Sequence, residues 1–202
     1  QSMRQAIAAG RFGSPVEIVA VSGQHFPTYR PAYREIYYNS RVTGGGAVQD
    51  ALTHVLNAGE FLVGPIDRVL ADAAHQVLEG VEVEDTVHVL ARHGLVLGNY
   101  CLNQYQAPNE STITVVCDRG TARFEIHRHR WSWMTEPGGL WHEEPEFSPE
   151  RDAVFIAQAH GFLAAVEGSS APACSLAAGL QTLRVNLAVL DASERPGWRS
   201  IH

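Results

Sequence analysis

The chain has 202 residues, of which 45% are hydrophobic and 18% are charged, a composition typical of a globular domain with an apolar core. Its formal net charge is -7, and no run of basic residues alternates with aromatic ones, which argues against a nucleic-acid partner. No apolar stretch approaches the roughly 20 residues of a bilayer span, and no signal segment leads the chain, so we expect a cytoplasmic protein without a membrane partner.

The first residues set the expected limits of the domain. Gln1 to Met3 resemble the end of a cleaved tag followed by an initiator Met, so we expect a single domain from Arg4 to His202. A short helical pattern over 4–9 is stopped by Gly10, and a β-branched, alternating strand is predicted over 15–21. Residues 24–41 are aromatic and polar, and a long loop of this kind is uncommon without a function.

A helix is predicted directly after Gly46, and strands follow it. The helix has an apolar side made of Val48, Ala51, Leu52, Val55 and Leu56. Strands are predicted over 67–74, 86–92, 96–104 and 111–117, separated by turn residues. A further strand is predicted over 121–127, and its extension through 134 is left open.

Two amphipathic helices close the chain. Ser148 and Pro149 make a good cap and first turn for the first helix, and Ser175 caps the second. The predicted core face of the first is Phe155, Ala159, Phe162, Leu163 and Val166, and the second carries a leucine stripe at 176, 180, 183, 187 and 190. Strands followed by helices indicate an α+β fold: one large, mostly antiparallel open sheet with helices packed on one face.

The cysteine and histidine residues give weaker signals. Cys101, Cys117 and Cys174 are odd in number and far apart, which fits inert, buried thiols in a reducing compartment. His127 and His129 would share one side of a strand and, with His142, suggest a metal-dependent hydrolase or a cupin-like site. Because an Arg stands beside each of the first two, we rank that hypothesis last and expect no metal.

Asp50 and His54 are the candidate catalytic residues. Four residues apart on the predicted helix, they share one face, and a carboxylate one turn away can orient an imidazole that transfers a proton to or from a hydroxyl. The spacing alone favours an exposed surface pair. The preceding Gly44-Gly45-Gly46 favours a site, because the missing Cβ atoms let a ligand or another backbone approach closely.

These residues carry a resemblance to a known family. The segment GGGAVQDALTHVLN is similar to the GGG-x-x-x-D-x-x-x-H signature in the C-terminal domain of the glucose-fructose oxidoreductase, inositol dehydrogenase and MocA family (Gfo/Idh/MocA). The likeness continues in order through the segments 10–15, 64–69, 84–86 and 120–124 and the helix pair spanning 162–183.

The resemblance implies a divided protein. Members of the family place a Rossmann domain in front, with a Gly-rich dinucleotide turn and a catalytic Lys. This chain has no G-x-G-x-x-G segment and no Lys at all. It therefore resembles the substrate-binding and oligomerisation domain of an NAD- or NADP-dependent oxidoreductase of CH–OH groups, acting on a sugar, inositol or related polyol. We expect this fragment to be inactive and to bind no cofactor without the N-terminal Rossmann domain.

By the resemblance, His54 is the general acid/base, and Asp50 is its partner or a substrate ligand. Gly45 and Gly46 would lie near the nicotinamide. Tyr29, Arg30, Tyr33 and Arg34 stand where family members often have a variable substrate-lining segment, although the residues themselves favour an ordered surface loop or a subunit contact.

Two further expectations concern partners. Family members commonly form homo-oligomers through the sheet face that no helix covers, and Trp131, Trp133 and Trp141 would be anchors near that interface. The alternative to an oxidoreductase domain is a free-standing, non-catalytic ligand-binding or oligomerisation module of the same fold.

Overall fold

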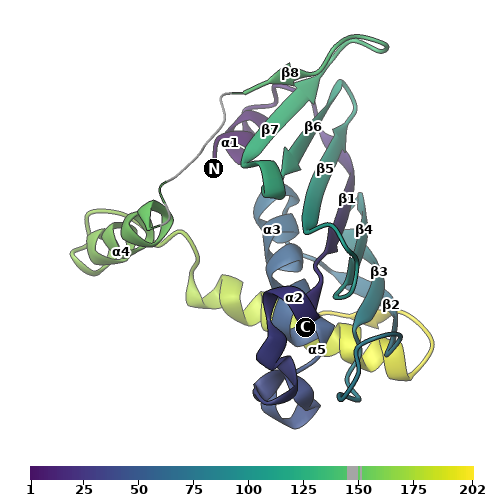
Figure 1. Ribbon diagram of the computed structural model, residues 1–202. Helices are drawn as coiled ribbons and strands as arrows, with labels where there is room; N and C mark the ends of the chain where they lie inside the picture. Colours follow the sequence, from purple (N-terminus) through teal and green to yellow (C-terminus); the bar gives the residue numbers. More distant parts are fainter. Residues whose placement is uncertain (145–149, 151) are drawn as a thin grey trace.

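The computed structural model describes residues 1–144, 150 and 152–202. Its main feature is a single open sheet in the order β8-β7-β6-β5-β1-β4-β3-β2-β9 (Figure 1). The strands are β1 (Pro15–Gly23), β2 (Arg68–Ala74), β3 (Thr86–His93), β4 (Val96–Asn103), β5 (Glu110–Cys117), β6 (Gly120–Glu125), β7 (Arg130–Met134), β8 (His142–Glu143) and β9 (Arg199–Ser200). β1 is central: it pairs parallel with β4 and antiparallel with β5, and the other recorded pairs are antiparallel.

The helices that pack on the sheet lie on one of its faces (Figure 1). They are α1 (Ser2–Ala8), α3 (Thr53–Val63) and α5 (Leu176–Glu194). The predicted α+β fold, with helices on one face of a mostly antiparallel open sheet, is confirmed. Within the described residues, no helix is both long and apolar enough to cross a membrane.

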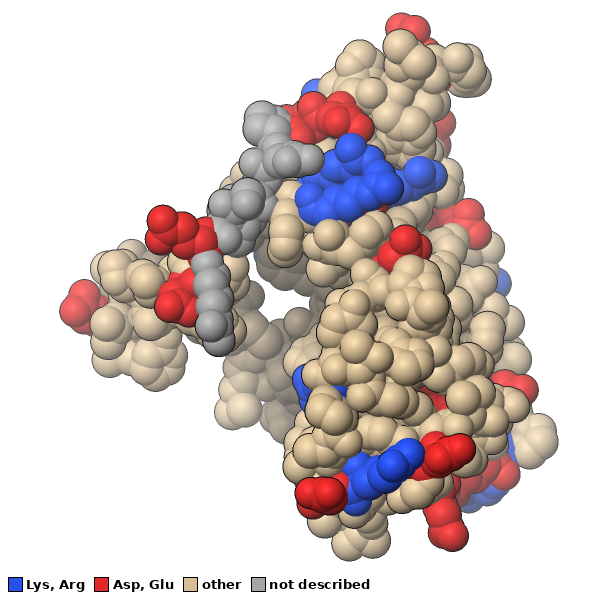
Figure 2. All heavy atoms as spheres, viewed as in Figure 1, with Lys and Arg blue, Asp and Glu red and all other residues tan. Residues whose placement is uncertain are grey.

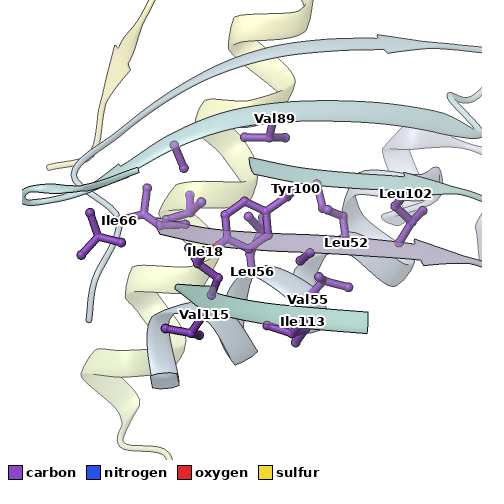
Figure 3. Packing of buried hydrophobic residues seen from close by; sticks show 14 of the residues in the cluster. Ile18, Leu52, Val55, Leu56, Ile66, Val89, Tyr100, Leu102, Ile113 and Val115 are labelled. Atoms are coloured by element: carbon purple, nitrogen blue, oxygen red, sulfur yellow. The ribbon is translucent and has the colours of Figure 1, made fainter. Parts of the chain in front are cut away.

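The core forms where the alternating strand pattern meets the apolar side of α3. Side chains of α3 and the turn before it, among them Leu52 and Leu56, lie against Ile18, Tyr100 and Ile113 from the sheet (Figure 3). All five are fully buried. Burial of each large apolar side chain stabilises the fold by about 1.5–3 kcal/mol, so this layer fixes α3 on the sheet.

Two buried polar side chains, His93 and Tyr100, are hydrogen-bonded to each other in the core. His93 Nδ1 lies 2.6 Å from the carbonyl oxygen of Gly64, and His93 Nε2 lies 2.8 Å from the Tyr100 hydroxyl. Because a carbonyl only accepts, Nδ1 carries the proton and Nε2 accepts from Tyr100. Burial lowers the pKa of His93 and raises that of Tyr100. The neutral, fully bonded imidazole is therefore the form that the fold stabilises.

The aromatic segment 24–41 is more regular than predicted. It forms the helix α2 (Phe26–Tyr29) and the short 3-10 turns η1 (Pro31–Arg34) and η2 (Tyr37–Asn39), followed by η3 (Arg41–Thr43). A second buried cluster holds these turns together; its members are Phe26, Tyr33, Tyr38, Leu78, Val81 and Val83. The segment is thus a small folded subregion with its own apolar centre.

The strand predicted over 121–127, with its possible extension, is a hairpin. β6 and β7 are antiparallel and are joined by the 3-10 turn η5 (Ile126–Arg128) and by His129, whose φ of 50° is left-handed. The prediction missed the turn because neither Gly nor Asn marks it.

The predicted interface role of two tryptophans is wrong. Trp131 is 8% exposed and its Nε1 donates to Ser2 Oγ at 2.9 Å, while Trp133 packs on Phe12 and stacks on His142. Both belong to the packing of the helix-covered face. Met3 of α1 also lies in the core, at 5% exposure.

The predicted inner faces of the last two helices are wrong. α4 (Ala153–Val166) projects away from the sheet and has no buried residue; Phe155 and Phe162 are each 69% exposed (Figure 1). The helix itself contains no Asp, Glu, Lys or Arg residue. α5 buries its residues at 182, 185, 186, 189 and 192 and exposes most of the leucine stripe. Ser148 and Pro149, the predicted cap, lie outside the described residues.

Candidate functional site

The site begins where the chain passes from the three glycines into the helix. Gly44 and Gly46 have φ values of 86° and 94°, in the left-handed region that favours glycine. The next turn, η4 (Val48–Leu52), is π-helical: the N–H of Thr53 donates to the carbonyl of Val48, five residues back. Single π turns inside helices are frequent at functional sites.

Glu84 fixes this helix start, and no motif in the sequence pointed to that role. Its backbone carbonyl accepts the Ala47 N–H at 2.8 Å, and Oε1 accepts the Val48 N–H at 3.2 Å. The carboxylate is 1% exposed and also pairs with Arg41 Nε at 3.1 Å. A buried carboxylate at a helix N-terminus satisfies unpaired backbone donors and complements the helix dipole.

Asp50 is held from the aromatic segment rather than by His54. Its side chain is 4% exposed, and Oδ1 accepts both from Arg30 Nη1, at 3.2 Å, and from the Tyr37 hydroxyl. The hydrogen bond to Asp50, with partial burial, raises the pKa of Tyr37, so this hydroxyl stays protonated. Among the described residues, no hydrogen bond joins Asp50 to His54. The predicted orientation of the imidazole by Asp50 is therefore not present, and no hydrogen bond from a described residue reaches Oδ2.

His54 is exposed and lines a hollow of about 430 Å³ between α3 and α5. The other lining residues are Gly44, Gln49, Thr53, Asn57, Cys174, Gly179, Thr182, Leu183 and Asn186. Most are polar, and none of them is Asp, Glu, Lys or Arg. The imidazole can therefore exchange a proton with a hydroxyl group that enters this hollow.

The structure separates the four residues expected to line the substrate. Arg30 reaches Asp50, as described above. Tyr33 is 1% exposed, and its hydroxyl donates to the Glu79 carbonyl at 2.8 Å; Arg34 Nε donates to the same carbonyl at 2.8 Å. These two residues hold the turn at Glu79, and no contact joins them to Asp50 or His54 in the described ranges. Tyr29 is 52% exposed.

The glycines expected near the nicotinamide face the protein itself. A Cβ on Gly45 would overlap the carbonyls of Tyr38 and Ser40, and one on Gly46 would overlap the Glu84 carboxylate. At Gly44 the corresponding space is open. The close approach that needs glycine is thus explained by packing at two of the three positions.

The structure also places the histidines considered as metal ligands, the cysteines and the basic side chains. Across the described part of the chain, no group of three His, Cys, Asp or Glu side chains could hold a metal ion. His127 pairs with the backbone of Ser111. The three cysteines are free thiols, but only Cys117 is buried; Cys174 is exposed, so the expectation of burial is wrong there. On the face in Figure 2, basic side chains form one patch in the upper part, beside acidic groups, and are scattered elsewhere.

Comparisons with known proteins agree with this architecture. Residues 1–123 match the model of the GFO/IDH/MocA C-terminal domain. The fold is similar to a levoglucosan dehydrogenase solved with NADH and levoglucosan (18% identity, TM-score 0.86, 98% of this chain and 62% of that one). It is also similar to an oxidoreductase domain protein from Kribbella flavida (19%, 0.88, 100% and 62%) and to the WlbA dehydrogenase from Bordetella pertussis solved with NADH and UDP-GlcNAcA (21%, 0.74, 100% and 60%).

At these identities, the solved structures establish the fold alone. The chain spans about three fifths of the length of each of them. No curated protein matches the sequence at a significant level. The family model covers more than half of the chain, from α1 into the strand β6. The chain belongs to the GFO/IDH/MocA family, of which it forms a C-terminal domain.

Proposed function

We propose that this chain is the substrate-binding and oligomerisation domain of an oxidoreductase that uses NAD or NADP and acts on a CH–OH group of a sugar, inositol or related polyol. The observation that carries the proposal is the exposed His54 at a polar hollow, one turn from the almost fully buried Asp50. Similar structures solved with NADH and levoglucosan or with NADH and UDP-GlcNAcA support this substrate class.

In this proposal the residues of the chain have distinct roles. His54 takes the proton from the substrate hydroxyl during oxidation and returns it during reduction. Asp50, fixed by Arg30 and Tyr37, binds a second hydroxyl through its remaining oxygen. Gly45 and Gly46 shape the helix start beside the cofactor through their backbone. The nicotinamide, when bound, supplies the hydride acceptor.

The remaining partner in the proposal is an N-terminal Rossmann domain. α4 and α5 expose apolar side chains, including Phe155, Phe162 and Leu176, that water does not favour. The similar structures are longer than this chain. We infer that the Rossmann domain covers these helices and supplies the dinucleotide site and the Lys, and that the chain alone is inactive.

The test uses a reading frame that encodes a Rossmann domain together with this chain. The purified protein is screened against sugars, inositols and sugar acids while nicotinamide absorbance is followed. His54→Ala should lower kcat by about 100-fold or more, as expected for the loss of a general acid/base. His142→Ala, on the edge strand β8, is the matched control and should leave kcat unchanged.

Two results would contradict the proposal. An unchanged rate in His54→Ala would remove His54 from the mechanism. Turnover of a polyol by the 202-residue chain alone would overturn its predicted inactivity. A gene that starts near Arg4, with no upstream Rossmann segment, would instead favour the free-standing binding module.

A further inference from the structure

The contact between α3 and α5 has a polar seam where helix pairs usually have an apolar one. Asn186 Nδ2 lies 2.7 Å from Thr53 Oγ1, and Asn57 Nδ2 lies 3.0 Å from Thr182 Oγ1. As residue numbers rise along α3 they fall along α5, so the two pairs are successive rungs of one ladder. Because buried polar groups are costly unless bonded, the seam needs a reason beyond packing.

One side chain of the seam, Asn186, lacks a hydrogen-bond partner in the described part of the chain for one end of its amide, whereas Thr182 is fully bonded. The Thr182 hydroxyl both accepts from Asn57 and donates to Glu60 Oε2, at 2.7 Å. Asn186 is 4% exposed, and its Oδ1 has no hydrogen-bond partner within the described residues. Exchanging the two ends of the amide would leave Nδ2 unpaired instead, so one end lacks a partner in either orientation. Buried polar groups without a partner are rare, and each calls for an explanation.

The hollow beside His54 offers an explanation for the unpaired amide oxygen of Asn186. Asn186 lines it together with His54 and the rest of the ladder. At Gly179 the space that a Cβ would take is empty, which leaves this side open. The volume of about 430 Å³ is in the range of small-molecule sites and far exceeds the space of one water molecule. The terminal torsion of Asn is broad, so a small rotation can turn the unpaired end toward the hollow.

We propose that the hollow between α3 and α5 is a subsite for the hydroxyl groups of a neutral polyol, with the Asn186 amide as its specificity-determining group. An amide donates and accepts, as a hydroxyl does, whereas no Arg among the described residues lines the hollow to bind an acidic sugar. The inference rests on the proposed function for the identity of the ligand, and it places a second contact point across the hollow from His54.

The first experiment is an NMR titration of the ¹⁵N-labelled 202-residue chain with levoglucosan, myo-inositol and D-glucose. Tetrahydropyran, a ring ether without hydroxyl groups, is the control ligand. At least one polyol should shift the Asn186 side-chain amide and the Thr53 and His54 backbone amides saturably, and tetrahydropyran should not. Absence of such shifts for all three polyols, up to about 100 mM, would overturn the subsite and leave a buried water as the partner of Oδ1.

The second experiment uses Asn186→Leu, which keeps the side-chain volume and removes both ends of the amide. It should weaken polyol binding roughly tenfold, the effect of one lost hydrogen bond. Arg184→Ala, on the exposed side of the same helix, is the matched control and should bind normally. Unchanged binding by a folded Asn186→Leu protein would contradict the inference, and the amide shifts of the unsubstituted chain decide the question if this variant does not fold.

Failure of the subsite and failure of the proposed function look different. In the protein that includes the Rossmann domain, Asn186→Leu should raise KM and leave kcat unchanged, whereas His54→Ala lowers kcat. Polyol turnover with an unaltered KM in Asn186→Leu would remove the subsite alone. Saturable amide shifts without any turnover would retain the subsite and remove the proposed reaction.

Discussion

The helix start gives the sharpest prediction, because two glycines with similar φ values have different surroundings. Gly44 and Gly46 are both left-handed, but only at Gly46 is the space for a Cβ occupied, by the Glu84 carboxylate. Gly44→Ala should therefore cost only the conformational term, about 1 kcal/mol. Gly46→Ala should cost that term and also displace a buried carboxylate that accepts the Val48 N–H and pairs with Arg41.

The size of the difference follows from those contacts. A hydrogen bond to a charged group contributes about 1.5–3 kcal/mol, and the ion pair to the half-exposed Arg41 adds less than about 1 kcal/mol. Gly46→Ala should then lower the free energy of unfolding by about 3–5 kcal/mol, a large part of the usual 5–15 kcal/mol. In thermal unfolding of a domain of this size, Tm should fall by roughly 10 °C, against roughly 3 °C for Gly44→Ala.

Urea unfolding of both variants measures the difference, and a double-mutant cycle locates it. In a Glu84→Ala background the Gly46→Ala cost should shrink to that of Gly44→Ala, because the carboxylate is gone. Equal destabilisation by the two glycine substitutions in the unsubstituted chain would refute the reasoning. It would also revive the view that all three glycines serve a ligand.

Three further predictions concern the buried histidine, the thiols and the uncovered sheet face. Burial lowers the pKa of His93, so the unfolded chain binds a proton at this residue more readily than the folded chain does. Tm should therefore be highest above about pH 6.5 and fall as the pH drops below that value. An equally steep fall of Tm with pH in His93→Gln would contradict this. Burial raises the pKa of Cys117 to about 11 and that of Cys101 above its usual value, whereas Cys174 is exposed. A thiol reagent at pH 8 should therefore modify Cys174 first, and Cys174→Ser should remove the fast phase; a fast phase that persists in this variant would contradict the prediction. If the chain self-associates through the uncovered sheet face, Leu97→Glu on β4, where Leu97 is 49% exposed, should shift the mass measured by light scattering toward that of the monomer. Leu95→Glu in the β3–β4 turn, where Leu95 is 96% exposed, is the control and should not. A monomeric unsubstituted protein would exclude this interface.

Much of the fold was predictable because its strands alternate. Val87, Val89 and Ala91 of β3 are all buried, and the strand limits predicted from such patterns lie within a residue or two of those observed. The periodicity of apolar residues did not predict the buried face of a helix where that face depends on which element packs against it. In α5 it identified the leucines, but Val185 and Val189 face the sheet, because a pattern shows which residues are apolar and not which neighbours are present.

The site was predictable only within one helix. Asp50 and His54 were visible because a helix places residues four apart on one face. Tyr37 and Arg30 reach Asp50 through the fold of the aromatic segment, which local spacing does not encode. The aromatic composition of 24–41 was the available signal, and it indicated a functional segment without identifying which side chains meet the carboxylate.

The place of β1 in the sheet has a consequence for how the domain folds. The first strand of the chain lies at the centre, and Val19 pairs with Asn99 on one side and Thr114 on the other. The sheet therefore cannot close during synthesis until β4 and β5 have emerged, and these long-range pairings make folding slow. Until then β1 presents two unpaired edges, a state open to wrong pairing with another nascent chain. A substitution that weakens β1 should accordingly reduce the yield of folded protein more than its effect on final stability suggests.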